Sequence, residues 1–168
     1  MHVDSVSFPH IDHVQDIRTL PQFKDGSVEL IYACQVLTYF DRDEVMTVLA
    51  EWRRVLSPGG VLRLSVINFD TIVRLYRAGL PLEWFLGWLY GKWTDGRGGF
   101  VYERTTYDQP SMTKVLANAG FDHIELWDWR TTEHADVDDY SQAYFPHMEK
   151  ERGILVNLNI QGRRPRDL

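Results

Sequence analysis

Apolar residues follow two different periods along this chain. Residues 28–36 form a nearly continuous apolar run, which predicts a strand covered on both faces in a parallel sheet. Over residues 45–56 the apolar positions recur at spacings of three and four, which predicts a helix with one buried side. Asp41 and Glu44 match a capping box at its start, and the Ser-Pro-Gly-Gly run over 57–60 ends it.

Strand character resumes at 61–67. A strand, a helix and a strand at this spacing predict a right-handed parallel crossover unit. The other predicted elements are helices over 70–77 and 109–119 and strands over 121–129 and 154–162. The last two strands suit an antiparallel pair at a sheet edge. Residues 79–99 are aromatic and punctuated by glycine, so we expect an insertion or lid there within a single domain spanning 1–168.

Composition narrows the class of protein. The net charge of −6 provides no basic surface for nucleic acid. The single cysteine, Cys34, excludes an internal disulfide and fits a reducing compartment, so we expect a cytoplasmic protein. Pro81 and Glu83 interrupt the longest apolar stretch, 80–90, which is too short to span a membrane.

Two segments carry a resemblance to a known family. Residues 25–33 and 51–64, the latter with the run Arg-Arg-Val-Leu-Ser-Pro-Gly-Gly-Val-Leu, resemble the central block of class I S-adenosylmethionine-dependent methyltransferases of the type-11 kind. Weaker similarity extends the match to about residues 2–165. The resemblance implies an α/β fold with a Rossmann-like sheet that is mostly parallel and has an antiparallel C-terminal edge pair. It also implies S-adenosylmethionine as cofactor.

The chain departs from this family at its start. The family's first strand ends in a glycine-rich turn that approaches the cofactor, but no glycine precedes Gly26 here. We therefore expect a truncated sheet in which the first strand and its helix are missing. In that fold the strand at 28–36 becomes a hydrophobic edge, which favours a homo-oligomer through this edge.

The resemblance also suggests which residues hold the cofactor. Asp4 matches the acidic residue that binds the ribose hydroxyls, and Asp16 matches the aspartate that contacts adenine. The alternatives are a frayed polar residue for Asp4 and a turn-capping aspartate for Asp16. The complete set of cofactor-binding candidates is Asp4, Asp16, Ile17, Cys34, Gln35 and Leu37.

Side chains just beyond the carboxyl ends of strands are candidates for the acceptor side, because open α/β sheets bind ligands there. They are Tyr39, Asn68, Tyr102 and Tyr140. Family members often carry histidine where Gln35 and Glu103 stand, so proton transfer by histidine is not expected. The aromatic residues of 84–93 either form an acceptor or partner surface or pack an inserted helix.

Two other chemistries are less well supported. His10, Asp12 and His13 with Asp16 contain metal-ligating side chains, but the two histidines lie on different sides of an extended segment, so we expect no metal. Cys34 has no histidine near it in sequence to activate it as a nucleophile, which favours a buried apolar role.

The leading hypothesis is methyl transfer from S-adenosylmethionine to a small-molecule or saccharide-like acceptor. The alternative is a non-catalytic interaction or regulatory subunit that has lost cofactor binding. A third hypothesis is that the chain is a shortened version of a longer enzyme.

Overall fold

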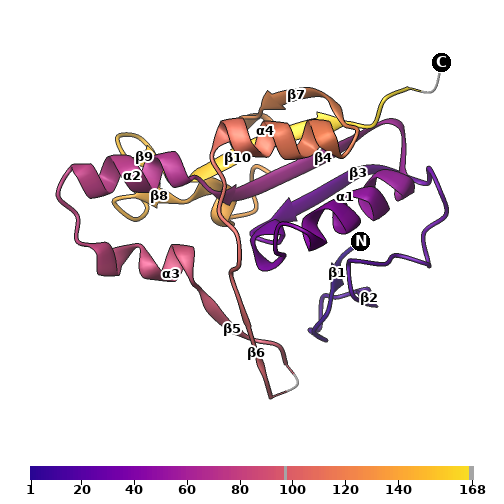
Figure 1. Cartoon of the computed structure of the whole chain (residues 1–168), viewed down its shortest axis with the longest axis horizontal. Helices are drawn as coiled ribbons and strands as arrows, with labels where there is room; N and C mark the ends of the chain where they lie inside the picture. Colours follow the sequence, from indigo (N-terminus) through magenta and orange to yellow (C-terminus); the bar gives the residue numbers. More distant parts are fainter. Residues whose placement is uncertain (97, 167–168) are drawn as a thin grey trace.

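The computed structural model describes residues 1–96 and 98–166, and its centre is a four-stranded sheet in the order β3-β4-β10-β7 (Figure 1). These strands are β3 (Val28–Cys34), β4 (Leu56–Ile67), β10 (Asn157–Arg163) and β7 (Asp122–Leu126). β3 and β4 pair in parallel, and β10 is antiparallel to both of its neighbours. Three of the strands therefore run in one direction, and the predicted antiparallel pair is β10 with the edge strand β7.

One face of this sheet is apolar. Leu64 lies beside Ala33 on β3 and beside Ile160 on β10, so these side chains form a row on that face. Helices α1 (Glu44–Val55) and α4 (Gln109–Asn118) cover it with residues such as Trp52 and Met112. The helix predicted from the three-and-four spacing is therefore confirmed.

The other face of the sheet is polar. Cys34, Ser65 and Asn159 form a row across three strands, one position away from the apolar row. The chain between β7 and β8 (Tyr144–Phe145) covers this face with two short 3-10 turns, η3 (Trp129–Thr131) and η4 (Tyr140–Gln142).

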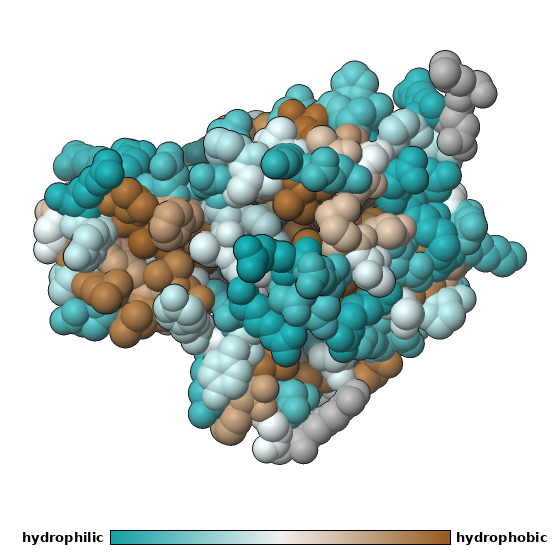
Figure 2. Space-filling model, in the orientation of Figure 1, coloured by the Kyte–Doolittle hydropathy of each residue, from teal (hydrophilic) through white to brown (hydrophobic). Residues whose placement is uncertain are grey.

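A second hydrophobic cluster lies at the carboxyl end of β4. It contains residues of α2 (Phe69–Arg77), of β9 (Ile154–Leu155) and of the segment with η2 (Leu82–Trp84) and α3 (Leu86–Leu89). Brown side chains gather around α2 and α3 on the face seen in Figure 2. Large apolar side chains exposed in this part of the chain include Tyr76, Leu82, Trp84 and Leu86.

The segment predicted as an insertion contains more regular structure than its sequence indicates. After α3 it continues into β5 (Lys92–Thr94), which pairs antiparallel with β6 (Phe100–Tyr102) in a hairpin projecting from the body (Figure 1). Residue 97, within the predicted 79–99 insertion, lies outside the described residues.

Four predicted strands have different boundaries. β4 begins at Leu56 and not at 61, so it includes the Ser-Pro-Gly-Gly run, and β3 ends at Cys34 because Gln35 takes a left-handed conformation. The strand expected over 121–129 ends at Leu126, because Asp128 accepts a hydrogen bond from the backbone of Arg130 and starts η3. The strand expected over 154–162 is divided at Val156, whose amide bonds to Ala143 instead of continuing one ladder.

The amino-terminal residues form a separate small unit. β1 (Val3–Asp4) and β2 (His13–Val14) pair in parallel and join no other sheet among the described residues. Within that part of the chain β3 pairs only with β4, so its second edge is open. This open edge agrees with the expected break in the sheet.

Candidate cofactor and acceptor site

The turn at the carboxyl end of β3 holds Gln35 in a constrained conformation. Its amide donates to the carbonyl of Ser65 at 2.8 Å, and its φ of +54° lies in the left-handed region. A residue other than glycine is held there only when its surroundings enforce it, at a cost of about 1–3 kcal/mol. Both polar atoms of its side chain are buried and have no hydrogen-bond partner among the described residues. The side-chain amide of Gln35 is therefore available to a polar ligand.

The 3-10 turn η1 (Leu37–Tyr39) follows directly. The Thr38 carbonyl accepts hydrogen bonds from the amides of Arg104 and Thr105, at 2.8 and 3.2 Å, which fixes the end of the β5–β6 hairpin here. The Thr38 hydroxyl is buried and has no partner in the described structure. Leu37, another cofactor-binding candidate, is fully buried in the core.

Two ionisable side chains meet beside this turn. Burial raises the pKa of Glu103 to about 7. Burial raises the pKa of Tyr39 to about 12, and the negative charges of Glu103 and of ionised Tyr140 act in the same direction. Tyr39, Tyr140 and Glu103 therefore lie in one electrostatic environment, although they come from three separate segments.

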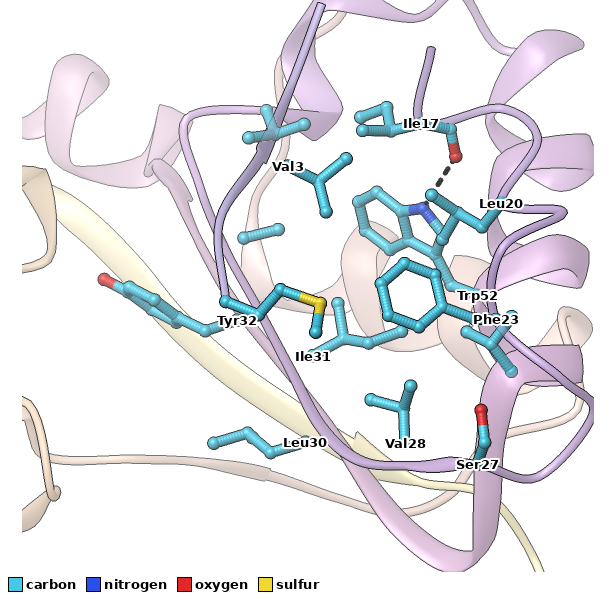
Figure 3. A pocket seen from close by; sticks show the side chains of 14 residues that line it. Val3, Ile17, Leu20, Phe23, Ser27, Val28, Leu30, Ile31, Tyr32 and Trp52 are labelled. Atoms are coloured by element: carbon cyan, nitrogen blue, oxygen red, sulfur yellow. Dashed lines mark hydrogen bonds between the residues drawn. The ribbon is translucent and has the colours of Figure 1, made fainter. Parts of the chain in front are cut away.

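An apolar cavity of about 490 Å³ lies along the open edge of β3 (Figure 3). Val3 and Ile17 line it from the amino-terminal unit, Trp52 from α1, and Ile31 from β3. The Trp52 indole donates to the carbonyl of Ile17 at 3.0 Å, which attaches the amino-terminal segment to α1. The cavity thus lies between the β1–β2 pair and the four-stranded sheet, which are not joined by strand pairing.

Residues 4–64 match the sequence profile of a methyltransferase domain family. This part of the chain therefore resembles a methyltransferase domain. Over 63 residues the chain is 38% identical to a malonyl-[acyl-carrier protein] O-methyltransferase of Xylella fastidiosa, covering 38% of this chain and 20% of that protein.

Solved structures show a similar fold over most of the chain. A methyltransferase from Methanosarcina mazei aligns with a TM-score of 0.53 at 17% identity, over 91% of this chain and 66% of that one. The 1,6-didemethyltoxoflavin-N1-methyltransferase of Burkholderia thailandensis, solved with S-adenosylhomocysteine, aligns at 0.54 and 15% identity, over 97% and 60%. The chain therefore spans one fifth of the curated relative and somewhat under two thirds of these two structures.

Two of the amino-terminal cofactor-binding candidates are partly engaged by other residues of the chain itself. The carboxylate of Asp4, at the end of β1, accepts the amide of Val6 at 2.8 Å. The carboxylate of Asp16 forms an ion pair with Arg18 at 2.7 Å. Ile17 lines the apolar cavity.

Cys34 lies on the polar face as a neutral thiol. Burial and the nearby negative charge of Asp139 raise its pKa to about 11. Such a thiol is a poor nucleophile at neutral pH. In the described part of the chain no three His, Cys, Asp or Glu side chains gather to hold a metal ion, and no helix is long and apolar enough to cross a membrane.

The acceptor-side candidates lie in different settings. Asn68 follows β4 and accepts the amide of Asp70 at 3.1 Å, which caps α2. Tyr102 ends β6 opposite Lys92 and is exposed. Tyr140 lies on η4 and is also exposed.

The sequence did not identify Thr38 and Glu103 as site residues. Thr38 carries no local signal, because its buried hydroxyl is significant only once the hairpin docks on η1. Glu103 stands out only by its place in the Tyr-Glu-Arg-Thr run where relatives often carry histidine.

Proposed function

We propose that this chain is part of an S-adenosylmethionine-dependent methyltransferase acting on a small-molecule or saccharide-like acceptor. The main observation in favour is the buried, unpartnered amide of Gln35 at the carboxyl end of β3. Ligands of open α/β sheets bind at this end. A side-chain amide offers both a donor and an acceptor. Its N–H group can donate to the α-carboxylate of the cofactor's methionine part, and its oxygen can accept from the α-amino group.

In this proposal the carboxyl end of β3, from Cys34 through Gln35, receives the methionine end of the cofactor. Asp4 would hold the ribose with the carboxylate oxygen that Val6 does not use. Ile17 would contact adenine, and Asp16 would have to exchange part of its ion pair with Arg18 to join it. The cofactor supplies an activated methyl group, and the protein aligns the acceptor and excludes water.

The acceptor would enter beside η1, between Tyr39 and Tyr140, with Asn68 and Tyr102 at the margin. Residues 79–99 and the β5–β6 hairpin would act as its lid within a single domain. The exposed aromatic side chains of this region, including Trp93, provide apolar surface for that role.

Calorimetric titration with S-adenosylhomocysteine tests cofactor binding. We expect heat of binding and a rise in Tm, equivalent to about 2.7 kcal/mol of stabilisation at a ligand concentration one hundred times Kd. Gln35→Ala should weaken binding at least tenfold, while Gln22→Ala, at an exposed glutamine, should not change it. Absence of both heat and stabilisation at millimolar ligand would exclude the enzyme hypothesis.

The open edge of β3 favours a second function, as an interaction subunit that self-associates. The backbone N–H of Gln35 donates to β4. Because backbone N–H groups alternate in direction along a strand, those of Leu30, Tyr32 and Cys34 point to the open side. An unpaired edge beside an apolar cavity is suited to receiving another strand. We propose that a second copy of this chain covers it.

Sedimentation equilibrium tests this association. We expect a dimer that Leu30→Lys converts to monomer, because a charge on the edge opposes pairing. Leu126→Lys is the matched control, since Leu126 is exposed on β7 at the opposite edge of the same sheet. A wild-type chain that stays monomeric at all concentrations would contradict the proposal.

A further inference from the structure

Glu103 is a half-buried carboxylate with no partner. Neither of its oxygens forms a hydrogen bond or ion pair within the described part of the chain. Among the other partly buried carboxylates there, only Asp122 likewise forms none, and its Oδ1 is buried without a partner. The burial that surrounds it is the cause of its raised pKa, and no neighbouring cation offsets this effect. A carboxylate of this kind is costly to the fold unless it serves another purpose.

Backbone hydrogen bonds fix the main chain at Glu103. The amide of Glu103 donates to the carbonyl of Gly91 at 3.1 Å, and the next amide, of Arg104, donates to Thr38. The carboxylate oxygen Oε1 lies 3.4 Å from the point where a Cβ on Gly91 would stand. That Cβ would also lie 2.8 Å from the carbonyl oxygen of Gly87, which is too close, so position 91 requires glycine.

Nearby cations are directed elsewhere. The Arg104 guanidinium pairs with Glu44 at 3.0 Å, and the Lys92 ammonium lies 3.8 Å from the centre of the Phe100 ring. The titratable group that interacts electrostatically with Glu103 is the phenol of Tyr39 on η1, which also interacts with Tyr140 on η4. Glu103 therefore lies near the Tyr39 hydroxyl, on a segment whose next amide bonds to the turn that follows β3.

We propose that Glu103 is the catalytic base that removes a proton from the methyl acceptor, and that the acceptor presents a neutral O–H or N–H group. This inference rests on the proposed function. The acceptor's oxygen or nitrogen forms its new bond to the methyl carbon with its own electron pair. Its proton passes to the Glu103 carboxylate, which becomes a neutral acid, and the electron pair of the broken carbon–sulfur bond stays on sulfur.

The same geometry disfavours acceptors that are carboxylates. A carboxylate acceptor carries no proton to remove, and its charge would be repelled by Glu103 with no cation nearby to compensate. The exposed rings of Tyr90, Trp93, Phe100 and Tyr102 lie on the hairpin or just before it. They favour an acceptor with an apolar or aromatic body.

A matched set of acceptors tests the proposal. Phenols, arylamines and sugars would be compared with benzoate-type carboxylates, using radiolabelled S-adenosylmethionine and the full chain. We expect turnover of O–H or N–H acceptors only, with kcat/KM rising with pH and levelling off above about 7. Glu103→Gln should lower kcat/KM by about 10²- to 10⁴-fold and remove this rise. Glu83→Gln, at an exposed glutamate of the same insertion, should change neither.

Thermal unfolding provides a readout that needs no acceptor. The pKa of Glu103 is raised on folding, so its charged form destabilises the native state increasingly as pH rises from about 4.5 to about 7. Glu103→Gln should therefore melt at a higher temperature than wild type at pH 8, and at nearly the same temperature at pH 4.5. A Tm difference that does not depend on pH would overturn the proposal even if no acceptor in the set is methylated.

The remaining outcomes separate the two proposals. Preferential turnover of carboxylates, or full activity of Glu103→Gln, would overturn the role of Glu103 and leave methyl transfer intact. Failure to bind S-adenosylhomocysteine would instead refute the proposed function.

Discussion

On one face of the four-stranded sheet, Leu64 and Val66 point into a core closed by α1 and α4, whereas on the other face Ser65 and Asn159 bond to each other and to a loop. Adjacent residues of the same strand thus belong to two different kinds of interior. Since side chains alternate along a strand, the pleat alone separates the two environments.

The difference lies in how each face is stabilised. The apolar face gains from the removal of hydrocarbon from water, which needs no particular geometry. On the polar face every buried group needs a partner, and three atoms, Asn157 Oδ1, Ser141 Oγ and His134 Nε2, have none among the described residues. We therefore expect the helical side to account for most of the stability and the loop side to open more easily.

The largest expected effect is on the apolar face. Leu64→Ala removes a side chain with no exposed surface, and should lower the free energy of unfolding by about 2–5 kcal/mol. Urea denaturation measures this loss. Leu126→Ala is the control, because 54% of Leu126 is exposed, and it should change stability by less than about 0.5 kcal/mol. Similar losses from both variants would contradict the assignment of the core.

An intermediate effect is expected on the polar face. The Ser65 hydroxyl donates to Asn159 Oδ1 at 2.7 Å and accepts from Asn157 Nδ2 at 2.8 Å, so Ser65→Ala removes the hydrogen bond of one buried acceptor and of one buried donor. The loss should be about 1–3 kcal/mol in the same denaturation experiment. Ser5→Ala, at an exposed serine, should have almost no effect. A loss larger than that of Leu64→Ala would reverse the proposed order of the two faces.

The smallest effect is expected at the rim of the polar face. Arg63 pairs with Glu133 at 2.9 Å, but 60% of the Glu133 side chain is exposed to water. Glu133→Gln should therefore cost about 0–1 kcal/mol, and this cost should diminish as salt is added. A loss that salt does not reduce would indicate a role for Glu133 beyond this ion pair.

Much of the fold was predictable because its signals are local. The spacing of apolar residues in α1 and the glycine and proline after it predicted this helix within one or two residues of its observed ends. The strand β3 and the capped helix α4 were recognised in the same way. The boundary errors near Asp128 and Val156 arose where a side-chain cap or a distant backbone partner ends a strand.

The candidate site was predicted less completely. Gln35 and Tyr39 were recognised because they follow a strand that ends at the ligand-binding edge. Glu103 was not, since its unusual environment depends on the docking of its own hairpin against Thr38, which lies about 65 residues earlier in the chain.

The sequence by itself determined the elements, the resemblance to methyltransferases and the open edge of the sheet, because periodicity, capping residues and a contiguous motif act over short distances. Only the tertiary structure decided which polar groups are buried without partners and which carboxylate is desolvated. These properties depend on how water is excluded between distant segments, and no local pattern of residues encodes that exclusion.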